Sequence, residues 1–314
     1  MKNHYVSRKY VVGSILFLLV LLYLIRLFFL QVIDTSYRSS ASNNVLRFVT
    51  QYPARGLIFD RNGKLLVYNE AAYDMMVIPS QTGPMDTTDF CNVLNLTRDE
   101  FDSRLSRAKE YSRYTASIFL GQISSADYAV LQEKMYKFPG FYVQPRTLRK
   151  YDREIAAHVL GYVSEVDEAD IRKDPYYKMG DFIGKSGVEK RYEASLRGNK
   201  GVKIFMVDVH NQIKGSYQSG RRDTVAVVGS DLTLTLDADL QEYGEGLMVN
   251  KIGSIVAIEP ASGEVLALVS APDYKPSRLV GRARSKEYGM LENDTLKPLF
   301  NRGLMAQYPP GSTF

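Results

Sequence analysis

The sequence predicts an α+β protein with a single N-terminal transmembrane helix and two soluble parts behind it. Three features carry this prediction: an apolar run over residues 11–33, a long mixed segment with both helical and alternating patterns, and a strand, helix and hairpin near the C-terminal end. With 314 residues, the chain is long enough for two soluble domains of ordinary size. Its hydrophobic fraction of 45% and charged fraction of 24% are typical of a globular protein.

Composition excludes several classes of function. The net charge of +5 is spread along the chain, and no Lys/Arg block alternates with aromatic residues, so we expect no nucleic-acid partner. The single cysteine, Cys91, excludes an internal disulfide and a thiolate metal cluster, and we interpret it as a small half-buried apolar residue. The histidines are far apart and lack metal-ligand spacing, so we assign them no catalytic role: His4, His158 and His210.

The apolar run of residues 11–33 would span roughly 35 Å as a helix, slightly more than a bilayer core. Arg26 interrupts it, but an arginine near the end of a span can extend its side chain to the interface. The positive-inside bias then predicts a cytoplasmic tail, residues 1–10, with the rest outside; the basic residues concerned are Lys2, Arg8 and Lys9.

Two alternatives to this anchor remain. Small residues at 39–41 suit cleavage of a signal peptide, but the apolar run is about twice the usual length of such a core. A buried core helix is disfavoured because the run has no polar face for water. We therefore expect an uncleaved anchor.

Several elements are expected in order after the anchor. Residues 50–69 predict two short strands joined by a turn at Asn62-Gly63. Residues 86–137 have helical spacing, and residues 141–153 read as a basic strand followed by a helix that ends at a glycine turn. Residues 180–201 predict one amphipathic helix between glycines, with these side chains on one face: Ile183, Val188, Tyr192 and Leu196.

The pattern changes near residue 229, where we place a domain boundary between residues 34–228 and 229–314. A strand of alternating Leu and Thr leads into a helix for which Asp237 is a plausible N-cap. Two apolar strands, residues 254–259 and 264–270, follow and are expected to be central strands of a buried sheet. The second domain has begun but is not finished by residue 314.

Ser312 follows Pro309-Pro310-Gly311, a rigid turn from which a helix can start. Backbone N–H groups at a helix start point outward and can stabilise an oxyanion, which suits a nucleophilic serine. From this local pattern alone, a helix cap is the commoner reading of such a serine.

Five segments together resemble the class B penicillin-binding proteins in order and spacing: RGLIFDRNG (55–63), GKSGVEKRYEASLRG (184–198), LTLD (234–237), SIVAIEPASGEVLALVSAPDY (254–274) and YPPGSTF (308–314). The resemblance implies an elongated, non-catalytic pedestal of the dimerisation type over residues 34–228. It implies the first, incomplete part of a β-lactamase-like serine transpeptidase domain over residues 229–314. In that family the nucleophile lies in S-x-x-K, and residues 312–314 match S-x-x, with the lysine expected at position 315.

By the resemblance, Ser312 attacks the carbonyl between the two D-alanines of a peptidoglycan stem peptide and forms an acyl-enzyme, which an amine of a neighbouring stem resolves. β-Lactams are expected to acylate the same serine, and no metal or organic cofactor is implied. Because the general base and the downstream motifs lie outside these residues, we expect this chain by itself to lack turnover.

The pedestal motifs of the family are matched at Arg55, Gly56, Asp60, Arg61, Gly63, Gly184, Gly187, Glu189 and Arg197. We interpret them as structural, with a turn held by an Arg/Asp pair, rather than as substrate contacts. Three chance matches to catalytic motifs are rejected as active-site residues: Ser106 to Lys109, Lys185-Ser186-Gly187 and Ser42-Asn43-Asn44.

The stretch GKSGVEKRYE is more similar to the elongation-type members of the family than to the division type. The resemblance then implies a periplasmic enzyme anchored in the inner membrane, whose partner is a membrane-embedded glycosyltransferase of the elongation machinery. Three alternatives stay open: a division-type transpeptidase, a non-catalytic module that activates a glycosyltransferase, and a penicillin-sensing receptor. The last is disfavoured by the short cytoplasmic tail.

Overall fold

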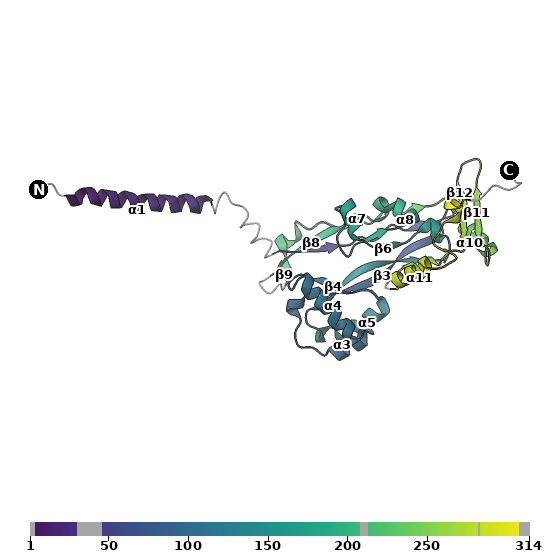
Figure 1. The fold of residues 1–314 in the computed structure, drawn as a ribbon, viewed down its shortest axis with the longest axis horizontal. Coiled ribbons are helices and arrows are strands. Elements are labelled where there is room, and N and C mark those ends of the chain that lie inside the picture. Colours follow the sequence, from purple (N-terminus) through teal and green to yellow (C-terminus); the bar gives the residue numbers. More distant parts are fainter. Residues whose placement is uncertain (1–3, 30–45, 208–212, 282, 308–314) are drawn as a thin grey trace. The chain divides into compact units, whose positions relative to one another are not determined.

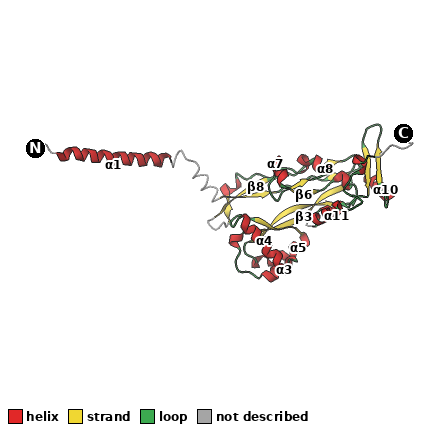
Figure 2. Cartoon of the chain, viewed as in Figure 1, coloured by secondary structure: helices red, strands yellow, loops and turns green. Residues whose placement is uncertain are grey.

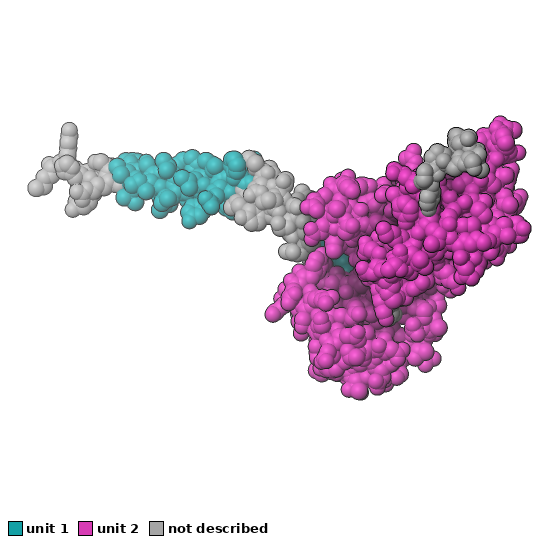
Figure 3. All heavy atoms as spheres, turned by 45° about the vertical axis from the view of Figure 1, so that its right-hand side comes forward, with its two compact units in different colours: residues 1–50, 202–224 teal, residues 51–201, 225–314 magenta. Residues whose placement is uncertain are grey.

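The structure is a computed structural model that describes residues 4–29, 46–207, 213–281 and 283–307. Two compact units are distinguished in Figure 3: residues 1–50 with 202–224, and residues 51–201 with 225–314. Each unit is described by itself.

The first unit begins with the helix α1, His4–Phe28. Its stretch Tyr10–Phe28 is long and apolar enough to cross a membrane by length and composition, and Arg26 lies in its last turn, as the sequence predicts (Figure 1). Residues 30–33 of the predicted span lie outside the described residues. The same unit contains a small sheet in the order β1-β8-β9, formed by Leu46–Gln51, Gly201–Val207 and Ile213–Ser216.

The second unit is built on a five-stranded sheet whose longest strand is β3, Leu65–Val77. The other strands are β2 (Ile58–Phe59), β4 (Ser117–Ser124), β5 (Phe141–Tyr151) and β10 (Leu232–Thr233). The order is β10-β2-β3-β4, and β5 also pairs with β3 in antiparallel register. The predicted hairpin of residues 50–69 is confirmed by the antiparallel pair β2 and β3.

Three helices cover one part of this sheet: α3 (Thr87–Leu94), α4 (Arg98–Tyr111) and α5 (Ser125–Lys134) (Figures 1 and 2). Asp86 caps α3, and a Thr97/Glu100 capping box begins α4. Their apolar faces enclose a core of aromatic rings in edge-to-face and tilted contacts around Phe90, which includes Phe101, Phe119, Phe138 and Phe141. Cys91 belongs to this core and is fully buried rather than half-buried.

The expectation that residues 86–137 are helical throughout is wrong for β4. Ile118, Leu120 and their neighbours pair with the C-terminal half of β3, because a strand there extends the sheet and buries Phe119 and Leu120 against the helices. The 3₁₀ turns η2 (Pro79–Gln81) and η3 (Met135–Lys137) lie at the ends of these elements.

The middle of the chain forms short elements packed around a second core: α6 (Ala157–Leu160), β6 (Val163–Glu165), α7 (Glu168–Lys173), β7 (Phe182–Gly184), α8 (Gly187–Arg191) and α9 (Glu193–Leu196). The single helix predicted for residues 180–201 is wrong. Tyr192 has φ −107° and ψ 23° and separates α8 from α9, while Ile183 lies in β7. The predicted common face is therefore broken: Leu196 is buried in the second core and Tyr192 is exposed.

The C-terminal part contains α10 (Ala238–Leu247), the antiparallel hairpin β11–β12 (Gly253–Ile258 and Val265–Ala271), α11 (Arg284–Glu292) and α12 (Arg302–Met305). A 3₁₀ turn, η5 (Pro276–Leu279), precedes α11. Asp237 caps α10 through the N–H groups of Asp239 and Leu240, which confirms the predicted N-cap. The hairpin is also confirmed.

The hairpin is not the centre of a buried sheet in this structure, contrary to expectation. Among the described residues β11 and β12 pair only with each other, and Val256 and Ile258 are 44% and 55% exposed. The boundary placed at residue 229 remains a prediction. Just beyond it, Leu232–Thr233 pairs in parallel with Ile58–Phe59 and so belongs to the five-stranded sheet.

Candidate functional site

The motif residues Arg55 and Glu189 meet in a buried ion cluster, although they are 134 positions apart in the chain. Arg55 Nη2 lies 2.7 Å from Glu189 Oε2 and 2.6 Å from Glu193 Oε2. The other oxygen of Glu189 accepts a bond of 2.7 Å from Arg149 Nε. The Glu189 side chain has no exposed surface, so its charge is balanced by two guanidinium groups rather than by water.

The cluster is completed by polar groups from several elements. Asn69 accepts from Arg149 Nη1 at 3.0 Å, and its amide donates to the Arg55 carbonyl at 2.6 Å. The Tyr177 hydroxyl and a backbone N–H donate to Glu193 at 2.8 and 2.9 Å. Burial lowers the pKa of Arg55, but the neighbouring carboxylates outweigh it and leave that pKa above its usual value. The Arg55 guanidinium therefore stays charged.

The motif glycines beside this cluster permit close backbone contacts. A Cβ on Gly56 would lie 1.9 Å from the Ser230 carbonyl oxygen, and one on Gly184 would lie 2.2 Å from the Glu189 carbonyl oxygen. Gly187 has φ +56° and is crowded by the backbone of Val159. Side chains at these positions would push the segments that carry Arg55 and Glu189 away from the backbones they pack against.

Asp60, Arg61 and Gly63 form a separate turn that contacts the start of α10. Asp60 is fully buried and accepts bonds from backbone N–H groups within its own turn, and from Ala238 N at 3.2 Å. The Arg61 N–H donates to the Leu236 carbonyl at 3.0 Å, and Gly63 has φ +78°. The turn thus joins the β2–β3 hairpin to α10.

The expected Arg/Asp pair in this motif is wrong. Arg55 pairs with two glutamates, and Asp60 accepts from backbone N–H groups, because a tight turn leaves its own N–H groups within reach of the Asp60 carboxylate. Arg197 makes a further ion pair, with Asp174 at 3.0 Å, and its guanidinium lies 3.7 Å from the centre of the Tyr176 ring.

Sequence reasoning missed Arg149, Asn69 and Glu193. Glu193 follows Glu189 by four positions, and Arg149 lies in the basic segment 141–153, but neither signal indicates a buried partner. The pairing of β3 with β5 aligns Asn69 with Arg149, and this pairing is not visible in the sequence.

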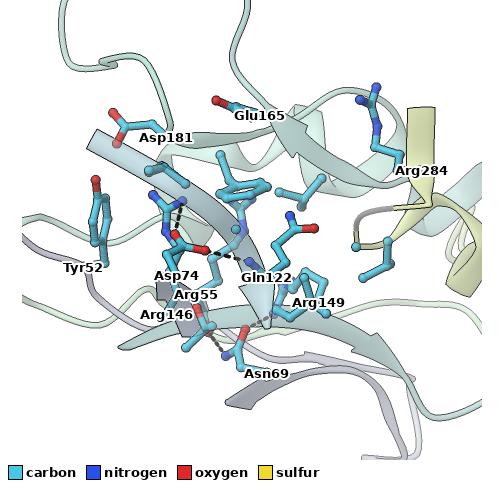
Figure 4. Close-up of a pocket in the computed structure, with 18 of the residues that line it drawn as sticks. Tyr52, Arg55, Asn69, Asp74, Gln122, Arg146, Arg149, Glu165, Asp181 and Arg284 are labelled. Atoms are coloured by element: carbon cyan, nitrogen blue, oxygen red, sulfur yellow. Dashed lines mark hydrogen bonds and ion pairs between the residues drawn. The ribbon is translucent and has the colours of Figure 1, made fainter. Parts of the chain in front are cut away.

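A cavity of about 510 Å³ lies beside the cluster in the second unit (Figure 4). Arg146 pairs there with Asp74 at 2.9 Å, and its guanidinium stacks on Tyr52 and Phe182 at 4.4 and 4.8 Å from the ring centres. Arg55, Asn69 and Arg149 line the same cavity and lie together in the lower part of the view.

The other candidates from the sequence either lie outside the described residues or are not members of the ion cluster. Ser312 lies outside the described residues, as do Ser42-Asn43-Asn44 and His210. Ser106 and Lys109 are exposed on α4, and Lys185 is paired with Asp167 at 2.9 Å and with Asp170, which fits a structural role for that segment. Among the described residues there is no group of three or more His, Cys, Asp or Glu that could hold a metal ion.

Glu245 of α10 connects the C-terminal part to the turn before α6. Its carboxylate accepts from Ala156 N at 2.7 Å and from Gln241 Nε2 at 2.8 Å. Burial raises the pKa of the Glu245 carboxyl from 4.5 to about 7, more than these two hydrogen bonds lower it. The Ala156 backbone has φ +53°, so this contact holds a left-handed residue in place.

We predict that Glu189→Gln lowers the free energy of unfolding by about 3–5 kcal/mol, because it leaves the buried Arg149 without a charged partner. Denaturant unfolding of the chain in detergent, followed by tyrosine fluorescence, measures the change. The matched control is Glu70→Gln, which removes an exposed pair with Lys150 and is expected to change stability by less than about 1 kcal/mol. Equal effects of the two changes would contradict a structural role for the cluster.

The raised pKa of Glu245 predicts a pH dependence of stability. A carboxyl whose folded pKa lies above its unfolded value binds protons more tightly when folded. The stability that Glu245 contributes is therefore greatest below pH 4.5, falls as the pH rises to about 7, and then levels off. The Glu245 contribution to this fall is at most about 3 kcal/mol. Unfolding curves between pH 4 and 8 measure it. Glu245→Gln should flatten the slope, and Glu70→Gln, which removes an exposed glutamate paired with Lys150, should not. An unchanged slope in Glu245→Gln argues against the assignment.

Comparisons with known proteins agree with this architecture. Residues 50–234 match the penicillin-binding protein dimerisation domain, and residues 253–314 match the penicillin binding protein transpeptidase domain. The chain is 34% identical over 322 residues to the peptidoglycan D,D-transpeptidase MrdA of Acinetobacter baumannii, covering 99% of this chain and 47% of that protein. It is 34% identical over 300 residues to MrdA of Escherichia coli K12, covering 91% and 46%.

A solved structure is also similar: the complex between penicillin-binding protein PBP2 and MreC from Helicobacter pylori. It matches with a TM-score of 0.66 and 28% identity, over 85% of this chain and 51% of that chain. The chain thus spans about half the length of the curated relatives it matches. The chain belongs to the penicillin-binding proteins, with that family's dimerisation domain followed by the start of its transpeptidase domain.

Proposed function

We propose that the protein to which this chain belongs is a peptidoglycan D,D-transpeptidase of the elongation type that uses Ser312 as its nucleophile. The observation that carries the proposal is the ordered match to the dimerisation and transpeptidase domains, together with relatives that are themselves named peptidoglycan D,D-transpeptidase. Ser312 falls within the residues matched to the transpeptidase domain.

In the proposed reaction, Ser312 Oγ attacks the carbonyl between the two D-alanines of a stem peptide and loses its proton to a base. The terminal D-alanine leaves with a proton, and an ester to the serine remains. An amine of a neighbouring stem then attacks this ester, which forms the cross-link and frees the serine. A β-lactam acylates the same oxygen when its ring amide opens.

The domain organisation is proposed as a cytoplasmic tail over residues 1–10, an anchor over 11–33, a pedestal over 34–228 and the start of the catalytic domain over 229–314. The apolar helix α1 and the basic residues at its N-terminal side support an inner-membrane protein with its bulk in the periplasm. In the pedestal, the motif residues hold the Arg55–Glu189 cluster and the Asp60 turn, and their role in this proposal is structural and not part of the reaction at Ser312.

The proposed partner is a membrane-embedded glycosyltransferase of the elongation machinery, which supplies the glycan strands whose peptides are cross-linked. The MrdA relatives support the elongation role, and the solved PBP2 neighbour was obtained in complex with another protein, MreC. A pedestal with a rigid, ion-paired interior is suited to present a constant surface to such partners.

Labelling with a fluorescent penicillin tests the nucleophile. In membranes that contain the full gene product, Ser312→Ala is expected to reduce the acylation rate by about 10³-fold or more, because no other oxygen replaces the attacking group. Ser106→Ala is the matched control, since Ser106 and Lys109 repeat the S-x-x-K spacing on an exposed helix face. Persistent labelling of Ser312→Ala, or its loss in Ser106→Ala, would refute the assignment.

Depletion of the gene product tests the elongation role by microscopy. Round cells are expected, because cross-linking of the side wall stops while cross-linking at the septum continues. Filamentous cells would instead support the division-type alternative.

A further inference from the structure

The wall of the cavity beside the ion cluster is rich in cations. Seven of its lining residues are basic and three are acidic. The basic residues are Arg55, Arg104, Arg146, Arg149, Arg197, Lys200 and Arg284, and the acidic ones are Asp74, Glu165 and Asp181. Glu189 and Glu193, which balance Arg55 and Arg149, do not line the cavity, so the cavity wall itself is more positive than the cluster as a whole.

Among the arginines that line this cavity, three guanidinium nitrogens have no hydrogen-bond acceptor in the described part of the chain: Arg284 Nε and, within the ion cluster, Arg149 Nη2 and Arg55 Nε. The side chains of Arg149 and Arg55 are buried, with 3% and 10% of their surface exposed. Their other nitrogens are used: Arg149 donates through Nε and Nη1, and Arg55 through both terminal nitrogens. A buried N–H without an acceptor is unfavourable because its water has been removed and not replaced, so these two donors favour a ligand oxygen.

The lowered pKa of Arg149 also favours a negatively charged ligand in the cavity. Burial lowers its pKa, and the positive charge of Arg55 lowers it further, so the attraction of Glu189 does not fully compensate. Glu189 is shared between Arg149 and Arg55, since each of its oxygens faces one of them. A further negative group in the cavity would stabilise the charged form of Arg149.

The other residues that line the cavity favour a carboxylate over a phosphate. Three carboxylates line the cavity, so a doubly charged phosphate would be repelled more strongly than a singly charged carboxylate. Arg55 Nε offers one unpartnered N–H and Arg149 Nη2 offers two, so donors are present for both oxygens of a carboxylate. Tyr52 and Phe182 add aromatic surface for the chain that carries that group.

We propose that this cavity binds the carboxylate of a peptide, with Arg149 Nη2 and Arg55 Nε as the donors that recognise it. Figure 4 shows both arginines at the same end of the cavity as Asn69. The site is independent of Ser312 and would give the pedestal a ligand-binding function of its own. A volume of about 510 Å³ accommodates an acidic side chain with its neighbouring peptide groups.

Isothermal titration of the full chain in detergent tests the proposal with two matched probes. Acetyl-Ala-Glu-Ala-amide carries one carboxylate, and acetyl-Ala-Gln-Ala-amide is its neutral isostere. The glutamate peptide is expected to bind at least tenfold more tightly than the glutamine peptide. A soluble stem peptide ending in D-Ala-D-Ala forms a second arm, and the tighter of the two acidic ligands identifies the source of the carboxylate.

Arg149→Lys keeps a positive charge for Glu189 but removes the spare Nη2 donor, so glutamate-peptide affinity is expected to fall at least tenfold. Arg153→Lys is the control, because Arg153 pairs with Asp239 and Glu242 and does not line the cavity. If Arg149→Lys does not fold, Gln122→Glu places a carboxylate in the wall and is expected to weaken binding to a similar degree.

Several outcomes would overturn the proposal. They are the absence of binding by both acidic ligands, equal binding of the glutamate and glutamine peptides, and undiminished affinity in the folded cavity variants. A loss of affinity in Arg153→Lys equal to that in Arg149→Lys would also count against it, since it would reflect net charge rather than this cavity.

Discussion

The buried ion cluster of Arg55, Glu189 and Arg149 is the interaction on which the second unit depends. Each charge alone would be costly to bury, and only the complete set satisfies all of them. The participants come from the segment before β2, from β5 and from α8, and Asn69 of β3 completes the arrangement. These elements must therefore adopt one relative position, and the glycines at positions 56 and 184 allow the backbones to come that close.

A second set of contacts connects this sheet to the C-terminal part. The Asp60 turn binds the start of α10, β10 pairs with β2, and Glu245 accepts from Ala156 N. The first residues matched to the transpeptidase domain therefore follow a helix that is attached to the dimerisation domain at several points.

The sequence predictions succeeded where an element depends on residues close to it in the chain and failed where it depends on distant residues. The anchor, the β2–β3 hairpin, the β11–β12 hairpin and the Asp237 cap depend on neighbours within a few positions, and all were predictable. Strand β4 was missed because it lies between helices and is stabilised by pairing with β3, about forty positions earlier. The break at Tyr192 was missed because the apolar spacing of residues 188–196 fits a continuous helix, whereas in the fold Tyr192 leaves helical φ and ψ between α8 and α9.

By itself, the sequence determined the apolar helix long enough to cross a membrane, the family resemblance and the residues of the pedestal motifs, since these depend on apolar length, local turns and ordered motifs. Only the tertiary structure decided what the motif residues do. It showed that Arg55 binds glutamates rather than Asp60, and that Arg149 completes the cluster. The physical reason is that the partner of a buried charge depends on which groups lie close to it in three dimensions and on whether water is excluded. The spacing of residues along the chain reveals neither.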